Sequence, residues 1–171
     1  MSRLDSFIRR LEAQRACLGR AAELVRELSG DVLELGLGNG RTYDHLRELF
    51  PRRSIWVCER RLAAHPQCVP PPELLLLGDM RETLPAARNR LVGRVALAHL
   101  DPASGDATAS RALAAELAPL IVPLLCPRAI LVSEPEIAAD GLVPLALPPG
   151  VAEHRYHLYI CTLAAEFQLL P

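Results

Sequence analysis

Hydrophobic residues follow two spacings along the chain, which predict a helical N-terminus and then alternating strands and helices. Between residues 3 and 28, apolar residues recur every three or four positions, as on one face of a helix. From residue 31 onward, short and almost continuously apolar runs alternate with segments of helical spacing. The predicted strands are residues 31–35, 54–59, 73–79, 94–101, 128–134, 142–147 and 154–163, and the predicted helices are residues 41–50, 81–91 and 107–125.

Two segments interrupt this pattern. Gln14, Arg15 and Gly19 break the N-terminal periodicity, which leaves open two helices in place of one. Residues 62–73 contain four prolines, which lack the N–H donors that a helix needs. We therefore expect mostly loop after the second strand.

Apolar strands separated by helices predict a parallel sheet that is covered on both faces. The last two predicted strands flank the sequence Pro-Pro-Gly and are expected to form an antiparallel pair. We therefore predict an α/β fold with a seven-stranded, mostly parallel sheet and an antiparallel last strand. Residues 1–29 are expected to form a helical cap. No linker or repeat divides residues 1–171, so a single domain is expected.

Composition and charge narrow the possible partners and the compartment. The net charge is −1, and all 19 basic residues are arginine, so no global field recruits nucleic acid. No uninterrupted apolar run reaches about 18 residues, so no membrane span is predicted. None of the five cysteines forms a Cys-x-x-Cys pair. Scattered thiols in an odd number favour a reducing, cytoplasmic location.

Three glycines at alternate positions follow the first strand, in the sequence Glu34-Leu-Gly-Leu-Gly-Asn-Gly40. Glycine tolerates positive φ and lets a ligand touch the backbone, and the N-terminus of the next helix offers free N–H groups. An anionic group is therefore expected on residues 38–42. The dinucleotide fingerprint G-x-G-x-x-G does not fit, because Arg41 stands where that motif places its third glycine.

Polar residues also end the next three strands, at the edge where ligands bind in such sheets. Glu59 and Arg60 end the second strand, Gly78-Asp79-Met80 the third, and His99-Leu100-Asp101 the fourth. Taken singly, Glu59 is explained as a solvated acid and Asp79 as a helix cap. Their joint spacing after the glycines favours a single ligand site.

This ordered set of motifs resembles class I S-adenosylmethionine-dependent methyltransferases, from about residue 30 to the end of the chain. The whole chain is similar to a small bacterial family of stand-alone methyltransferases. The resemblance implies a Rossmann-like fold in which the glycine loop receives the amino-acid end of the cofactor, Glu59 the ribose and Asp79 the adenine. The cofactor residues that it implies are Glu34, Gly36, Leu37, Gly38, Asn39, Gly40, Thr42, Glu59, Arg60, Gly78, Asp79, Met80 and His99.

The resemblance also implies direct, in-line methyl transfer. His99 and Asp101 are the candidates for a catalytic base, because this strand end faces the methyl group in such enzymes. Packing of the His99 ring on adenosine is an equal alternative. Asp101 with Glu134 could instead hold Mg²⁺, although the Asp-Asn pair of the metal-dependent enzymes is missing. His154 and His157 are expected on opposite faces of one strand, which disfavours a shared metal.

The acceptor is expected to be a small molecule. The fourth strand lacks the N/D-P-P-Y/F/W motif of enzymes that methylate amino nitrogens of bases or glutamine. We expect no nucleic-acid or membrane partner, and homo-oligomerisation is possible. Two alternatives remain open: an NAD(P)-binding oxidoreductase, and a non-catalytic protein that binds S-adenosylmethionine.

Overall fold

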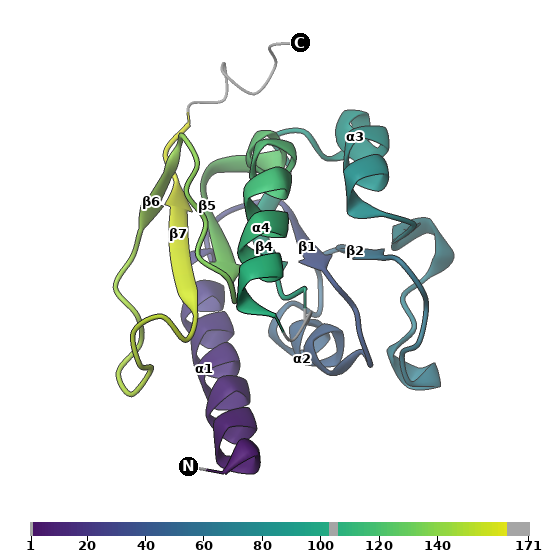
Figure 1. The fold of residues 1–171 in the computed structure, drawn as a ribbon. Coiled ribbons are helices and arrows are strands. Elements are labelled where there is room, and N and C mark those ends of the chain that lie inside the picture. Colours follow the sequence, from purple (N-terminus) through teal and green to yellow (C-terminus); the bar gives the residue numbers. More distant parts are fainter. Residues whose placement is uncertain (1, 103–105, 164–171) are drawn as a thin grey trace.

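Seven strands form one sheet in the computed structural model, which describes residues 2–102 and 106–163 (Figure 1). The sheet order is β3-β2-β1-β4-β5-β7-β6. Strands β1 to β5 are parallel, and β7 is antiparallel to both of its neighbours. The strands are β1 Asp31–Leu35, β2 Ile55–Glu59, β3 Leu75–Leu77, β4 Val95–Leu100, β5 Leu125–Ser133, β6 Leu142–Pro144 and β7 His157–Cys161.

Helices cover both faces of the sheet, as predicted. Helices α1 and α2 pack on one face, and α3 and α4 pack on the other. The helices are α1 Arg3–Leu24, α2 Arg41–Leu49, α3 Met80–Leu91 and α4 Ala107–Ile121, and short 3₁₀ turns occupy Pro66–Cys68, Pro72–Leu74 and Val122–Leu124. The proline-rich segment therefore holds only two single turns, as its missing N–H donors predict.

The N-terminal segment is one helix, so the possibility of two helices is not realised. Ser2 and Asp5 form a reciprocal capping box at its start. Cys17, Leu18 and Ala21 are buried on its inner face. The interruption at Gln14 does not end the helix, because that side chain is buried in a polar network described below.

Alternation along the central strands divides the core into two layers. Val32, Val57 and Leu97 pack toward α1 and α2. Leu33, Cys58 and Ala98 pack toward α3 and α4. Because side chains alternate between the faces of a strand, residues 34 and 99 belong to the layer under α1.

The segment that contains α4 resembles a membrane span in length and composition. Residues 107–124 have a mean hydropathy of 1.2 over 18 residues and are long enough to cross a membrane. Arg111 and Glu116 interrupt this stretch, so it contains no uninterrupted apolar run of that length. Its buried residues pack against the sheet as part of α4, which is how the core helix of an α/β fold acquires such a composition.

Arg53 forms hydrogen bonds with the backbone of the segment that connects α1 to β1. Its Nη2 atom donates to the carbonyl oxygens of Val25 and Leu28, at 2.7 Å each. These carbonyls lie just past the C-terminal end of α1, where helical partners run out. Arg53 therefore sets where α1 ends relative to the sheet.

Replacing Arg53 with methionine should lower the free energy of unfolding by about 1.5–3 kcal/mol, because hydrogen bonds from a charged donor are lost. Arg52→Met is the matched control, since the Arg52 side chain is exposed. It should change stability by no more than about 0.5 kcal/mol. Denaturant unfolding measures both, and equal effects of the two variants would contradict this role of Arg53.

Candidate functional site

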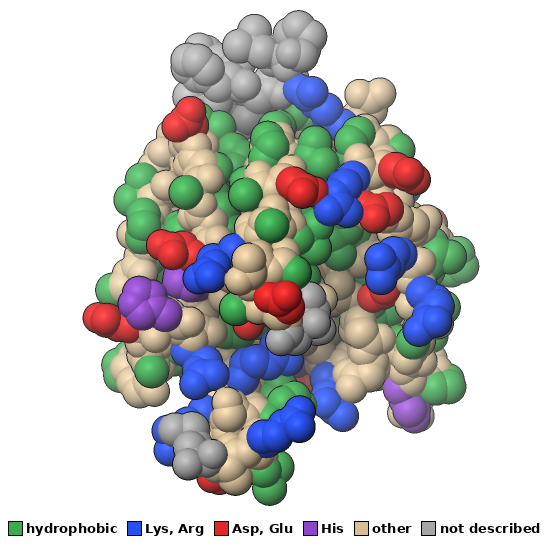
Figure 2. Space-filling model, in the orientation of Figure 1, with side chains coloured by type: hydrophobic (Ala, Val, Ile, Leu, Met, Phe, Trp, Pro, Cys, Tyr) green, Lys and Arg blue, Asp and Glu red, His purple; other side chains and the backbone are tan. Residues whose placement is uncertain are grey.

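A cavity of about 730 Å³ lies at the carboxyl ends of β1, β2 and β4. This is the point where the strand order reverses, and ligands bind there in open α/β sheets. The glycine loop after β1 forms its floor, and residues of α1 form its far wall. In Figure 2, basic side chains gather in the lower part of the molecule, where Figure 1 places α1.

The three glycines of the loop differ in what surrounds them. A Cβ atom on Gly36 would lie 2.6 Å from the carbonyl oxygen of Asp101. A Cβ atom on Gly40, the N-cap residue of α2, would collide with the Cβ atom of Cys68. Gly38 has φ +53°, yet a Cβ atom there would meet nothing within 4 Å. The first and third glycines therefore allow tight packing, whereas Gly38 faces open space in the cavity.

Glu59 braces this loop from the end of β2. Its Oε2 atom accepts hydrogen bonds from the backbone N–H groups of Leu37, at 2.9 Å, and Gly38, at 3.0 Å. Its Oε1 atom accepts from the Arg61 N–H at 3.0 Å. Glu59 is therefore more than a solvated strand-end acid, because it fixes the shape of the cavity floor.

Asp79 and Met80 line the same end of the cavity as Glu59. Asp79 accepts a hydrogen bond from the Arg81 N–H at 2.9 Å and caps α3. This backbone hydrogen bond holds the pKa of the Asp79 carboxyl below its usual value. The capping role considered for Asp79 is therefore present, and the side chain reaches the cavity as well.

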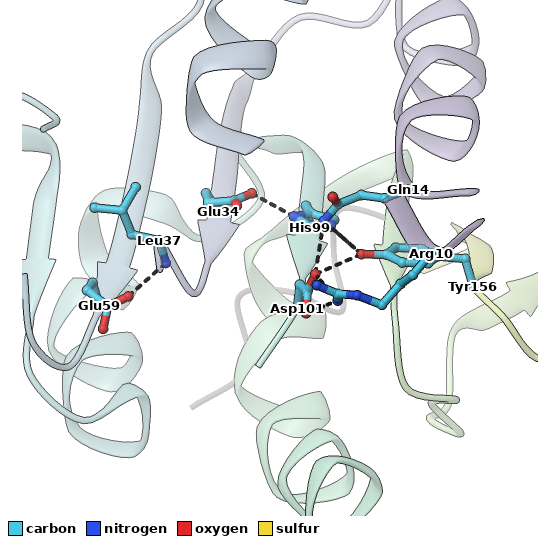
Figure 3. A network of polar contacts seen from close by, with 8 residues as sticks. All are labelled: Arg10, Gln14, Glu34, Leu37, Glu59, His99, Asp101 and Tyr156. Carbon is cyan, nitrogen blue, oxygen red and sulfur yellow. Dashed lines mark hydrogen bonds and ion pairs between the residues drawn. The ribbon is translucent and has the colours of Figure 1, made fainter. Parts of the chain in front are cut away.

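Asp101, at the end of β4, is the hub of a polar network that reaches α1 (Figure 3). Arg10 donates to both carboxylate oxygens through Nη1, at 3.0 and 2.8 Å. Gln14 donates to Oδ2 at 2.9 Å, and the Tyr156 hydroxyl donates to it at 3.1 Å. Three donors from α1 and from the segment before β7 therefore converge on one carboxylate.

Glu34 and His99 form a fully buried pair beneath this hub. They are register partners on β1 and β4, and His99 Nδ1 lies 2.7 Å from Glu34 Oε2. Burial raises the pKa of Glu34. Burial alone lowers the pKa of His99, but the carboxylate of Glu34 outweighs it and raises that pKa. Each group therefore holds a proton more firmly than it would in water.

The pair is linked to the hub through Tyr156. Burial raises the pKa of Tyr156, so its hydroxyl keeps its proton. Gln14 Nε2 donates to the Tyr156 oxygen at 2.9 Å, and His99 Nε2 lies 3.2 Å from that oxygen and 3.4 Å from Gln14 Nε2. A proton between His99 Nδ1 and Glu34 Oε2 makes their 2.7 Å contact a hydrogen bond. Full burial favours a pair without net charge.

The structure corrects the expectation for His99. Its side chain is fully buried and does not line the cavity, so it neither faces the cavity as a base nor packs on a ligand there. The ring points to the α1 side of the sheet, together with Leu97 and opposite to Ala98. Asp101 is the predicted catalytic residue that does line the cavity.

The geometry also bears on the two metal hypotheses. Arg10 places its cation against Asp101, where Mg²⁺ would have to bind. His154 lies in the turn before β7 with φ +60°, so the two histidines are not on one strand. Their rings lie 6.5 Å apart, which corrects the expectation of opposite faces. Within residues 2–102 and 106–163, no group of three or more His, Cys, Asp and Glu side chains could hold a metal ion.

Comparisons with known proteins agree with this geometry. A family model described as S-adenosyl-L-methionine methyltransferase matches residues 1–161. The chain belongs to this family. A crystal structure of an S-adenosyl-L-methionine methyl transferase from Silicibacter pomeroyi is 44% identical, with a TM-score of 0.90, and the match covers 94% of this chain and 99% of that one. Among curated proteins there is no match.

More distant structures show the same fold. Human methyltransferase-like protein 13 in complex with SAH is 15% identical, with a TM-score of 0.52, and the match covers 94% of this chain and 84% of that one. The antibiotic-resistance methyltransferase Kmr is 16% identical, with a TM-score of 0.50, and the match covers 88% and 93%. The Rossmann-like methyltransferase fold predicted from the motifs is thereby confirmed.

The cavity of this methyltransferase fits S-adenosylmethionine, the cofactor of the family. Its volume lies within the range of about 300–1,000 Å³ that is typical of ligand pockets. The open space at Gly38 leaves room for a group against the loop backbone. Glu59 and Asp79 place two carboxylates at one end of the cavity, where hydroxyl and amino groups would find acceptors.

Most of the predicted cofactor residues line this cavity, and their contacts with the cofactor stay predictions. Those in its wall are Gly36, Leu37, Gly38, Asn39, Thr42, Glu59, Arg60, Asp79 and Met80. The other four support the wall from behind or below: Glu34, Gly40, Gly78 and His99. The Gly78 N–H, for example, donates to the Glu59 carbonyl oxygen at 2.9 Å.

The wall contributed by α1 was not predicted. Phe7, Arg10, Leu11 and Gln14 lie at helical spacing and face the cavity. The available signal was Gln14, a polar residue on the otherwise apolar stripe between Leu11 and Leu18. Its partners lie 87 and 142 residues away in the sequence, so local pattern could not identify them.

Alanine at Gly40 should destabilise the methyltransferase more than alanine at Gly38. Both positions have positive φ, which costs a side chain about 1–2 kcal/mol. Only at Gly40 does the new Cβ also meet Cys68. Thermal unfolding of the two variants measures the difference, and equal losses would contradict the packing role of Gly40.

Removing one member of the buried pair should cost more stability than removing both. His99→Leu leaves the carboxyl group of Glu34 buried without a partner, which should cost about 3–5 kcal/mol. Glu34→Leu combined with His99→Leu removes both polar groups and should restore part of that loss. Denaturant unfolding of the single and double variants measures this coupling. Additive losses would show that the two residues are not coupled and would contradict the pairing.

Proposed function

We propose that this chain transfers the methyl group of S-adenosylmethionine to a small-molecule acceptor, a reaction of class EC 2.1.1. The observation that carries the proposal is that one continuous cavity joins the Glu59 and Asp79 end to the glycine loop, Asp101 and α1. One end suits adenosine, and the other is left for the acceptor. Family membership supports the reaction, and the cavity and the net charge support a small acceptor.

The chemistry asks little of the protein beyond positioning. S-adenosylmethionine, when bound, supplies a methyl group that is already activated. The glycine loop and Glu59 would orient one partner, and Phe7, Leu11 and Gln14 would orient the other and exclude water. Such alignment is worth several kcal/mol of barrier. Asp101 is the carboxylate in the cavity wall at which an acceptor proton can be received.

Helix α1 supports the choice of a small acceptor. It lies against the acceptor end of the cavity through Phe7, Arg10, Leu11 and Gln14. Arg10 and Gln14 are both bonded to Asp101, so this wall is fixed to the sheet. A cavity with such a fixed helical wall suits a small molecule. The net charge of −1 likewise offers no attraction for nucleic acid.

The compartment, the domain organisation and the partners of the enzyme are also proposed. We place the enzyme in the cytoplasm as a single domain of residues 1–171 with a cap at residues 1–29. No nucleic-acid or membrane partner is proposed. Exposed Leu4, Phe7 and Ile8 on α1 make self-association possible.

Two other functions are tested by binding and turnover. An oxidoreductase should bind NAD(P) and ignore S-adenosylhomocysteine, which calorimetry distinguishes. A non-catalytic binding protein should bind S-adenosylmethionine but release no S-adenosylhomocysteine across a panel of small metabolites. Release of S-adenosylhomocysteine that depends on one acceptor would establish methyl transfer.

Glu59→Gln should weaken S-adenosylhomocysteine binding by about tenfold or more, because the substitution removes charged acceptor bonds worth about 1.5–3 kcal/mol. Glu73→Gln is the control, since Glu73 is an exposed acid outside the cavity wall. Isothermal titration calorimetry on folded protein measures both. Unchanged affinity in Glu59→Gln would remove this residue from the cofactor site.

A further inference from the structure

Arg10 presents a hydrogen-bonding edge to the cavity that the described residues leave unused. Its contacts with Asp101 run through Nη1 alone. Within residues 2–102 and 106–163, neither Nε nor Nη2 donates to a partner. The Arg10 side chain is 26% exposed and belongs to the cavity wall. The Nε–Nη2 edge of a guanidinium group matches both oxygens of a carboxylate.

This edge is held in place by the network around Asp101. The Asp101 carboxylate, which accepts from Nη1, also accepts hydrogen bonds from Gln14 at 2.9 Å and from the Tyr156 hydroxyl at 3.1 Å (Figure 3). The guanidinium carbon lies 6.0 Å from the centre of the Phe7 ring. A ligand would therefore meet an arginine that is already ordered, which lowers the entropic cost of binding.

The surrounding charges permit a second anion at Arg10. The Asp101 carboxylate accepts hydrogen bonds from Arg10, Gln14 and Tyr156, so Arg10 is not its sole stabilising partner. Glu134, the other nearby acid, is half-buried, and this burial, followed by the charge of Asp101, raises the pKa of its carboxyl. The cations Arg10 and Arg155 act in the opposite direction. A guanidinium group can bridge two carboxylates because its donors lie on separate edges.

We propose that the Nε–Nη2 edge of Arg10 binds a carboxylate inside the cavity. The proposal rests on the proposed function, under which two molecules can bring such a group: the amino-acid end of the cofactor and the acceptor. Phe7 and Leu11 flank Arg10 in the cavity wall and would contact the carbon chain that carries the carboxylate. Both sources share the same chemistry, and the experiment separates them.

The first arm compares S-adenosylhomocysteine, which carries the amino-acid end, with 5′-methylthioadenosine, which lacks it. Calorimetry is carried out on the parent protein, Arg10→Gln and Arg9→Gln. Arg9 is an exposed arginine on the same helix outside the cavity wall, so its variant controls for general charge. If the cofactor supplies the carboxylate, Arg10→Gln should bind S-adenosylhomocysteine about tenfold to a hundredfold more weakly and 5′-methylthioadenosine as the parent does.

The second arm titrates butyrate into protein saturated with S-adenosylhomocysteine, followed by NMR. If the acceptor supplies the carboxylate, the parent and Arg9→Gln should bind butyrate, and Arg10→Gln should not. Affinity for S-adenosylhomocysteine should then be unchanged by Arg10→Gln. Either pattern supports the proposal and identifies the source of the carboxylate.

Arg10→Lys guards against loss of folding, because it keeps a cation beside Asp101 but removes the planar edge. Its affinity in the responding arm should lie below the parent and the Arg9→Gln control, and thermal unfolding verifies its fold. If the parent binds S-adenosylhomocysteine and neither Arg10 variant changes any of these affinities, the carboxylate proposal is overturned and the cofactor assignment stands. If the parent does not bind S-adenosylhomocysteine at all, the proposed function itself fails.

Discussion

The carboxylate of Asp101 is the point on which the arrangement of this site depends. Asp101 directly follows β4, and its carboxylate receives hydrogen bonds from Arg10 and Gln14 on α1 and from Tyr156 before β7. Its backbone also closes on the glycine loop, since its carbonyl oxygen leaves no room for a Cβ on Gly36. A single residue thereby positions the acceptor wall, the last antiparallel strand and the cofactor loop relative to one another.

Most of the polar groups beneath this hub have hydrogen-bonding partners. His99 lies within hydrogen-bonding distance of the Tyr156 hydroxyl through Nε2 and of the Glu34 carboxylate through Nδ1. One atom, Glu34 Oε1, has no partner among the described residues. A partly satisfied buried network costs stability compared with an apolar core. What it gives in return is a fixed orientation for groups at the cavity surface.

The sequence predicted the parts of this structure that depend on local pattern. Strand β1 was placed to the residue, and β2 and β4 to within one residue at each end, because apolar runs bounded by polar or glycine residues mark them sharply. The cavity-lining residues after β1, β2 and β3 were predicted as well, because they stand at the carboxyl ends of these strands. The short β3 and β6 were overestimated, since an apolar run does not reveal where pairing with a neighbouring strand stops.

The prediction missed what depends on register and on distant contacts. His99 was assigned to the cavity because it ends a strand, but the face on which it lies depends on how β4 pairs with β1. That pairing sets His99 beside Glu34, under α1. Gln14 was interpreted as an interruption of an amphipathic helix and Arg10 was not singled out, because their partner Asp101 lies about 90 residues away.

These misses have a common physical origin, which also indicates where specificity arises in this fold. The cofactor end of the cavity is built from short segments next to parallel strands, and their chemistry is visible in the sequence. The acceptor end is built from α1, whose inner residues must satisfy Asp101 and line the cavity at the same time. Changes at Phe7 or Leu11 alter the cavity without breaking a polar contact of the hub. The helix can therefore vary its acceptor wall while Arg10 and Gln14 keep it docked on the same sheet.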